Sequence, residues 1–217
     1  SGGEGSGLFK SIDGGITWRE ITNGLPAKPF GRIAMTLAPS DPKKMWAIVE
    51  SKNTGLYISD DGGESWKSQS ASMNVCARPF YFSTIEVDPK DPKRVYRPGF
   101  LFAYSEDGGY SFSEASYEGG GLHPDMHALW IHPNNPDILY VGTDGGIYRS
   151  IDKGITWIFN QNLPVGQFYH VAHDLEKPYH VYGGLQDNGS WMAPTAAPGG
   201  ISNARWDRLN GGDGFWT

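Results

Sequence analysis

One eight-residue pattern recurs four times along this chain, and it constrains the fold more strongly than any other feature. Each copy has a serine, an aspartate two positions later, a glycine two positions after that, and an aromatic residue at its end. The copies begin at residues 11, 59, 105 and 150, so successive starts are 48, 46 and 45 residues apart. A period of this length predicts a structure built from repeated units, one for each copy of the pattern.

The recurring pattern lies between two strands in each unit. A short apolar segment precedes every copy, at residues 7–10, 55–58, 101–104 and 146–149. The glycines supply the positive φ that a tight hairpin needs, and the serine and aspartate oxygens can accept hydrogen bonds from nearby amides. The closing Trp or Phe is expected to fill the space between neighbouring sheets. We therefore interpret the four aspartates as structural.

A second pattern precedes the last three copies. Two strand-like runs joined by a proline-bounded loop occupy residues 33–46, 85–96 and 129–140. Because proline lacks an amide donor, it ends the first strand of each pair. Each period then contains four strands, which is the composition of one blade of a β-propeller. The sequence predicts an all-β fold of propeller blades with four antiparallel strands each, as part of a larger ring.

The two patterns also predict where the blades begin and end. We expect a partial blade over residues 1–25, blades at about 30–70, 80–115, 125–160 and 167–210, and the start of another at 211–217. The fourth complete blade lacks the serine–aspartate turn and has a long loop at 193–200 instead. Because both ends of the chain fall inside blades, and propellers usually close with four to eight, we expect a fragment of a longer polypeptide. The alternative is a small ring closed by both termini.

The composition excludes several classes of function. The net charge is -6 and the 18 Lys and Arg residues are scattered, which is not the electrostatic footprint of a nucleic-acid-binding protein. Cys76 is the one cysteine, so an intramolecular disulfide and a zinc site of several cysteines are both excluded. No apolar stretch approaches the roughly 20 residues of a membrane helix, so we predict no membrane span.

The repeated Ser-x-Asp-x-Gly-x-Thr-Trp pattern resembles the Asp-box, or bacterial neuraminidase, repeat. That repeat occurs in sialidases, xyloglucanase-like glycosidases, sortilin-type receptors and photosystem II assembly factors, so it indicates a fold and not an activity. Further motifs resemble those of large exported bacterial proteins called sortilin-like or glycosyl-hydrolase-like. Among them are residues 78–82, 123–130, 182–191 and 211–215. The resemblance implies a propeller in the periplasm or outside the cell. No xyloglucanase motif can be transferred residue by residue, and no sialidase arginine triad is recognisable.

Three groups of polar residues are not explained by the repeat, and the first is His123, Asp125 and His127. In an extended chain, alternate residues share one face of the strand, so these three side chains could point the same way. Imidazoles with a carboxylate can bind zinc or a similar ion. The alternative is a hydrogen-bonded structural cluster, because the sequence offers no clear fourth ligand.

The second group is Gln186, Asp187 and Asn188, with Trp191 close behind, in the blade that lacks the serine–aspartate turn. Amides beside a carboxylate suit sugar hydroxyls or a calcium ion, and an indole ring can stack on a sugar. The alternative is local turn chemistry, because Asp-Asn-Gly is a good tight-turn sequence.

The third group pairs Asp144 with Asp213, each in an Asp-Gly context near the end of a strand. Two carboxylates at a suitable separation could act as acid and base in glycoside cleavage. The alternative is again a turn function, because Asp-Gly favours hairpin turns. A zinc or calcium ion at one of these groups is the one cofactor that the sequence suggests.

Three functional hypotheses follow. The leading one is a non-catalytic interaction or scaffold module of an exported bacterial protein, whose partner is another protein or the rest of a larger polypeptide. The first alternative is a carbohydrate-active propeller, either a glycoside hydrolase or a glycan-binding protein. The second is an auxiliary subunit of a membrane or photosynthetic complex, which depends on analogy with propeller assembly factors.

Overall fold

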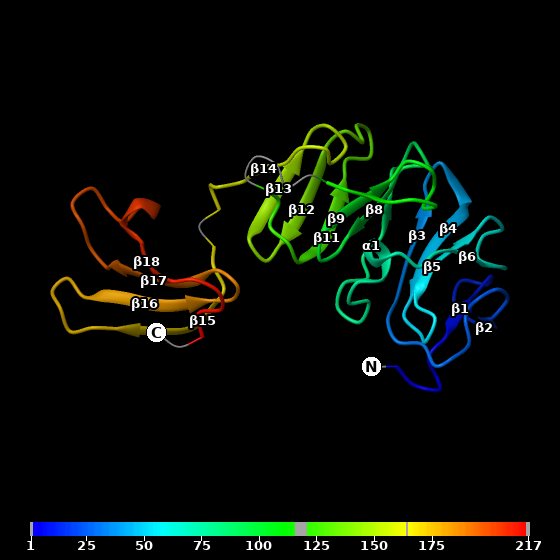
Figure 1. Cartoon of the computed structure of the whole chain (residues 1–217), viewed down its shortest axis with the longest axis horizontal. Helices are drawn as coiled ribbons and strands as arrows, with labels where there is room; N and C mark the ends of the chain where they lie inside the picture. Colours follow the sequence, from blue (N-terminus) through cyan, green and yellow to red (C-terminus); the bar gives the residue numbers. More distant parts are fainter. Residues whose placement is uncertain (1, 116–120, 164, 216–217) are drawn as a thin grey trace. The chain divides into compact units, whose positions relative to one another are not determined.

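The computed structural model describes residues 2–115, 121–163 and 165–215, and these residues form antiparallel sheets (Figure 1). The chain divides into two compact units, Ser1–Asn160 and Gln161–Thr217. In the first unit the strands are β1 Leu8–Lys10, β2 Arg19–Ile21, β3 Ile33–Ala38, β4 Asp41–Val49, β5 Gly55–Ser59, β6 Lys67–Ser70, β7 Glu86–Val87, β8 Val95–Pro98, β9 Phe102–Ser105, β10 Ser113–Glu114, β11 Met126–Ile131, β12 Leu139–Thr143, β13 Gly146–Ser150 and β14 Ile158–Phe159.

The second unit contains β15 Phe168–His173, β16 His180–Leu185, β17 Gly189–Pro194 and β18 Asp207–Asn210. Helical structure in the described residues is limited to α1, Met73–Cys76, and a 3-10 turn at Asn203–Arg205. Neither has the length and apolar character needed to cross a membrane. The predicted all-β fold class is confirmed.

Each four-stranded sheet is a meander in which consecutive strands pair, for example β3-β4-β5-β6 and β11-β12-β13-β14. In an antiparallel meander, alternate connections lie at the same end of the sheet. The proline loops and the serine–aspartate turns therefore share one end, which we call the Asp-box end. The second-to-third strand turns and the segments that lead into each first strand share the other, which we call the connector end.

The core of the first unit lies between neighbouring sheets, and β4 shows how the sequence produces it. Its residues from Trp46 to Val49 are fully buried, and alternate side chains enter different clusters. Trp46 and Ile48 pack with Val95 of β8, whereas Ala47 and Val49 pack with Ile21 of β2. A strand that is buried on both faces reads as a continuous apolar run, as β4 does.

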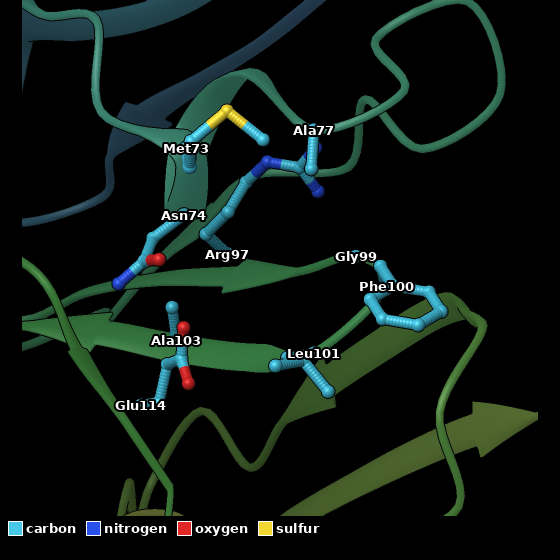
Figure 2. Close-up of a pocket in the computed structure, with 9 residues that line it drawn as sticks. All are labelled: Met73, Asn74, Ala77, Arg97, Gly99, Phe100, Leu101, Ala103 and Glu114. Atoms are coloured by element: carbon cyan, nitrogen blue, oxygen red, sulfur yellow. The ribbon is translucent and has the colours of Figure 1, made fainter.

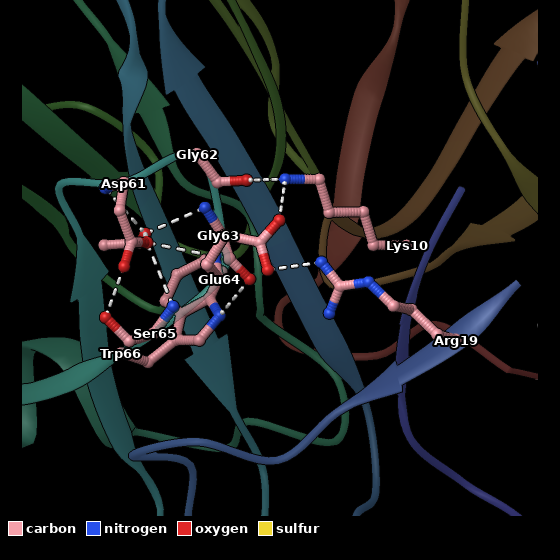
Figure 3. Close-up of polar contacts among 9 residues, drawn as sticks. Lys10, Arg19, Asp61, Gly62, Gly63, Glu64, Ser65 and Trp66 are labelled. Carbon is pink, nitrogen blue, oxygen red and sulfur yellow. Dashed lines mark hydrogen bonds and ion pairs between the residues drawn. The ribbon is translucent and has the colours of Figure 1, made fainter. Parts of the chain in front are cut away.

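The serine–aspartate turn after β5 is closed by its own polar atoms (Figure 3). Ser59 Oγ accepts a hydrogen bond from the Gly63 amide at 2.8 Å. Asp61 Oδ1 accepts one from the Ser65 amide at 2.9 Å, which Figure 3 shows. Hydrogen bonds from the Ser65 hydroxyl and amide hold the pKa of Asp61 well below its ordinary value. Gly62 and Gly63 adopt φ of +76° and +85°, which L side chains rarely adopt. This aspartate is therefore structural.

The aromatic residue that closes each turn is buried to a different extent from one sheet to another. Trp66 is 3% exposed within the cluster that contains Ile21, and the ring of Trp157 lies 4.9 Å from that of Phe102 in the preceding sheet. Trp18 is instead 62% exposed, so the predicted filling of an inter-sheet space does not hold there.

Candidate functional site

Two of the predicted groups meet at the connector end of sheet β11–β14. His127 lies in β11, and Asp144 lies in the turn between β12 and β13. Met126 pairs with Thr143 and Ala128 pairs with Gly142, so His127 is the extra residue of a bulge at this point of the ladder. The His127 Nε2 to Asp144 Oδ1 distance is 2.9 Å. One residue predicted for metal binding and one predicted for catalysis therefore belong to a single cluster.

Asp125 is the second carboxylate of this cluster. Its amide donates to the carbonyl of Phe100 at 3.1 Å, and its own carbonyl accepts a hydrogen bond from the Asp144 amide at 3.1 Å. Burial and the nearby charge of Asp144 raise the pKa of Asp125, against an opposing effect of Arg78 and the two neighbouring histidines. Asp125 therefore stays protonated to a higher pH than an ordinary aspartate.

Aromatic rings lie beside His127, the residue whose Nε2 contacts Asp144. The rings of Tyr81 and Phe82 lie 5.3 Å and 5.5 Å from the imidazole of His127. Phe82 is buried, whereas Tyr81 is 49% exposed and Phe100 is 41% exposed. We refer to Tyr81, Phe100, Asp125, His127 and Asp144 as the acidic–aromatic cluster. It combines exposed ring faces with charged oxygen atoms at one end of the sheets.

The structure does not arrange His123, Asp125 and His127 as three metal ligands. Asp125 has a φ of 61°, and the register shifts between Met126 and Ala128, so the alternation assumed for an extended chain is broken. His123 Nδ1 instead lies 2.9 Å from the carbonyl of Pro124. Among the described residues, no group of three His, Cys, Asp or Glu side chains is placed to hold a metal ion. Histidine, cysteine and carboxylate ligands for the predicted zinc ion are therefore not assembled in the described part of the chain.

Arg97 of β8 positions one side of the cluster, and sequence reasoning missed it. It is 1% exposed, and its guanidinium donates to the carbonyls of Val75, Phe82, Thr84 and Pro98. Burial lowers the pKa of Arg97 to about 10, which leaves it charged at neutral pH. The guanidinium therefore ties β8 to the segment 75–84, which carries Tyr81. The sequence signal was an arginine inside the otherwise apolar end of a strand.

A cavity of about 190 Å³ adjoins the cluster at Phe100 (Figure 2). Its wall is mainly apolar and includes Met73, Leu101 and Ala103, with the polar groups of Asn74 and Glu114 at the end away from Phe100. Pockets that enclose a drug-sized molecule usually measure roughly 300–1,000 Å³, so this one suits a smaller chemical group.

The second unit contains the remaining predicted residues, and their polar groups close a turn between β16 and β17. Asn188 Nδ2 donates to the carbonyl of Gln186 at 2.8 Å, and Trp191 Nε1 donates to that of Asn188 at 2.7 Å. Asp213 Oδ1 accepts the Asp187 amide at 2.9 Å. A φ of 56° at Asp187 fits the tight-turn alternative. Sugar or calcium binding by this group stays a prediction.

Asp213 and Asp144 belong to different units, and each is hydrogen-bonded within its own unit. Their pairing as acid and base therefore stays a prediction. The start of a further blade was expected at residues 211–217. Gly214 of this segment donates to the carbonyl of Leu185 at 3.0 Å, and residues 216 and 217 lie outside the described residues.

Comparisons with known proteins identify the repeat and several similar proteins. The BNR/Asp-box repeat family matches residues 57–68. A xyloglucanase of Hypocrea jecorina (strain QM6a) is 32% identical over 202 residues, which cover 81% of this chain and 22% of that protein. A Paenibacillus xyloglucanase is 27% identical over 166 residues, or 70% of this chain and 14% of that protein. The chain thus spans about a fifth or less of the length of these relatives.

Among solved structures, an ancestral GH74 enzyme superposes with a TM-score of 0.54 at 17% identity, over 94% of this chain and 28% of that one. The GH74 enzyme of Niastella koreensis gives a TM-score of 0.52 at 15% identity, over 82% and 30%. At these identities the likeness shows the fold.

The chain is therefore an Asp-box β-propeller protein. It is similar in sequence to glycoside hydrolases named xyloglucanases. This similarity overturns the leading sequence hypothesis of a non-catalytic scaffold and favours the carbohydrate-active alternative. The scaffold hypothesis was wrong because it depended on the structural role of the Asp-box residues. That role gives no information about the residues at the connector end. The hypothesis of an auxiliary subunit of a membrane or photosynthetic complex stays a prediction.

Proposed function

We propose that this chain forms part of a carbohydrate-active propeller that binds and cleaves a polysaccharide of the xyloglucan class, with the acidic–aromatic cluster in contact with the sugar. The observation that carries the proposal is the meeting of two carboxylates, Asp125 and Asp144, beside exposed aromatic rings. The similarity to xyloglucanases supplies the class of substrate.

The aromatic residues provide the binding surface in this proposal. Tyr81 and Phe100 are 49% and 41% exposed, so a sugar ring can lie against them. A sugar has apolar C–H faces and polar hydroxyl edges, and it therefore suits aromatic rings flanked by carboxylates and an imidazole. The cavity beside Phe100 offers room for a substituent of the bound chain.

The two carboxylates have different roles. Asp125, whose pKa is raised, acts as the general acid that donates a proton to the departing glycosidic oxygen. Asp144 acts as the charged partner, as a base toward water or as a nucleophile. His127, with its proton on Nε2, donates to Asp144 Oδ1 and holds that carboxylate in place.

The proposed substrate also implies a location. Polysaccharides of this class lie outside the cytoplasm, so we place the protein in the periplasm or outside the cell. The relevant partner is then a carbohydrate chain.

The experiment compares Asp125→Asn and Asp144→Asn with the unmodified chain. Each substitution should lower the release of reducing ends from xyloglucan by about 10²- to 10⁴-fold, the usual contribution of a general acid or base, while retardation in a xyloglucan gel is kept. Asp60→Asn, at a 61% exposed side chain in the Asp box of residues 59–66, is the matched control and should change neither readout. A chain that neither binds nor cleaves the polysaccharide, or aspartate variants with full activity, would show the proposal to be wrong.

A further inference from the structure

Two sheets of this protein share a polar motif in the loop between their first two strands. In each, an aspartate is followed six residues later by an arginine or histidine and eight residues later by a tyrosine. The two sets are Asp88, Arg94 and Tyr96 in sheet β7–β10, and Asp174, His180 and Tyr182 in sheet β15–β18. The two loops also close in the same way, because the aspartate amide donates to the carbonyl six residues later, at 3.0 Å and 3.2 Å.

In the second unit the motif satisfies its own polar atoms. Asp174 Oδ1 accepts a hydrogen bond from the Glu176 amide at 3.1 Å, which closes the turn. Asp174 Oδ2 accepts one from His180 Nδ1 at 2.8 Å and another from the Tyr182 hydroxyl at 3.0 Å. Both oxygens of this carboxylate are therefore paired within the motif.

In sheet β7–β10 the turn forms but the rest of the motif does not close. Asp88 Oδ1 accepts the Lys90 amide at 2.8 Å, as Asp174 accepts that of Glu176. Asp88 Oδ2, Arg94 Nε and the Tyr96 hydroxyl are buried, and none makes a hydrogen bond of ordinary geometry within the described residues. These side chains are 1%, 5% and 0% exposed. Buried polar groups are normally paired with protein or with bound water, because leaving them unpaired is destabilising.

The contacts of Arg94 explain why the two motifs differ. Its guanidinium carbon lies 4.1 Å from the ring centroid of Tyr104 and 5.3 Å from that of Tyr96. Nη1 forms an ion pair with Glu106, and Nη2 donates to the carbonyl of Lys153 at 2.8 Å. The guanidinium is therefore engaged elsewhere, whereas the imidazole in the second unit bonds directly to its aspartate.

The charges around Tyr96 indicate which molecule fits between these groups. Burial raises the pKa of Tyr96 to about 12, and the charges of Arg94 and Asp88 act on it in opposite directions. A cation would face the guanidinium, and an anion would face the carboxylate. The unpaired atoms are one acceptor, one donor and one hydroxyl, so they suit a neutral molecule that both donates and accepts. A buried water molecule typically makes about three such hydrogen bonds.

We propose that one water molecule is bound between Asp88, Arg94 and Tyr96 as a permanent part of the structure. The water donates to Asp88 Oδ2 and accepts from Arg94 Nε and from the Tyr96 hydroxyl. It supplies to this aspartate the hydrogen bond that the imidazole supplies in the second unit.

This water site goes beyond the proposed function and is independent of it. Asp88, Arg94 and Tyr96 are buried within the first unit, and none belongs to the acidic–aromatic cluster. Failure of sugar binding would leave the inference untouched.

The first test is a high-resolution crystal structure of the full chain. The expected result is a water oxygen within about 2.7–3.2 Å of Asp88 Oδ2, Arg94 Nε and the Tyr96 hydroxyl. A peak with oxygen ligands at about 2.3–2.6 Å would instead be a cation. A direct hydrogen bond between Tyr96 and Asp88, or no density between the three groups, would show that no water binds. Any of these last three results would overturn the inference.

The second test counts long-lived water molecules in solution by oxygen-17 magnetic relaxation dispersion. Arg94→His introduces the imidazole of the second unit, which should bond directly to Asp88 and remove the water from the count. Tyr96→Phe removes one of the three hydrogen bonds and should shorten the residence time of the water by about 3- to 10-fold. Circular dichroism of each variant establishes that it is folded.

Tyr182→Phe is the matched control for Tyr96→Phe. It removes the equivalent hydroxyl at a position where that group already bonds directly to Asp174. It should leave the relaxation signal of the unmodified chain unchanged. The same change in both tyrosine variants, or an unchanged signal in Arg94→His, would overturn the inference.

Discussion

The two ends of the same sheets use their polar residues in different ways. At the Asp-box end, each aspartate is satisfied by amides and hydroxyls of its own turn, and the arrangement repeats from sheet to sheet. At the connector end, Asp125 and Asp144 face other segments of the chain, and their surroundings do not repeat. Repeated polar residues therefore maintain the fold, while the residues that escape the repeat are free to carry chemistry. Four substitution experiments would break or sharpen this contrast.

The largest effect is expected from Trp66→Ala. Removing a Trp side chain that is 3% exposed leaves a cavity between two sheets and should lower the free energy of unfolding by about 3–5 kcal/mol. Trp18→Ala, at the same position of an exposed box, is the control and should cost less than about 1 kcal/mol. Urea denaturation at low protein concentration measures both. Equal losses would mean that the closing aromatic acts within its turn and not between sheets.

Arg97→Met comes next and acts at the connector end. It leaves the carbonyls of Val75, Phe82 and Thr84 without their buried donor, which should cost about 2–4 kcal/mol. Arg97→Lys keeps the charge and loses the fork of donors, so it should recover part of this loss. Amide exchange should increase first in residues 75–84. An unchanged unfolding midpoint in Arg97→Met would contradict the positioning role.

Ser59→Ala should have a smaller effect at the Asp-box end. The Gly63 amide, which donates to Ser59 Oγ at 2.8 Å in a buried setting, loses its acceptor. The expected cost is about 1–3 kcal/mol. Ser11→Ala removes the same bond, to Gly15, in an exposed turn where water can replace it, so its cost should be clearly lower. Equal losses in the two variants would mean that the stability gained from this hydrogen bond does not depend on burial of the turn.

The smallest effects concern the pH dependence of stability, which has opposite signs for an aspartate at each of the two ends. Although burial raises it, hydrogen bonds from Ser111 and Ser105 hold the pKa of Asp107 at about 2, below its ordinary 3.8. Its stabilising contribution is present above pH 3.8 and is lost as the pH falls through about 2. Burial and Asp144 raise the pKa of Asp125, so its contribution is present below 3.8 and is lost as the pH rises through its raised value.

Two variants test these signs. Relative to the unmodified chain, Asp107→Asn should be less stable at neutral pH and lose that deficit in acid. Asp125→Asn should instead gain relative stability as the pH rises. Urea midpoints between about pH 2 and 7 give both curves. If the stability of both variants relative to the unmodified chain changed with pH in the same direction, the two aspartates would not differ in the way that we describe.

The repeat predicts the sheets and the turn geometry because its glycines, serines and aspartates act within eight residues of sequence. The pair of His127 and Asp144 could not be predicted in the same way, since it depends on the pairing of β11 with β12, on the bulge between Met126 and Ala128, and on the positive φ of Asp125. Strict alternation therefore gave the wrong neighbours for His123. The positioning role of Arg97 could not be predicted from the sequence, because its partners are backbone carbonyls, which every residue carries.

The central claim is that sugar binds at the connector end, and the most direct measurement is an amide NMR titration of the full chain with xyloglucan oligosaccharides. The account predicts shifts concentrated at residues 78–82 and 99–101 and around Asp125, His127 and Asp144, with the amides of Asp13, Asp61 and Asp107 unmoved. Shifts centred on the Asp-box turns, or no shifts at millimolar sugar, would contradict it.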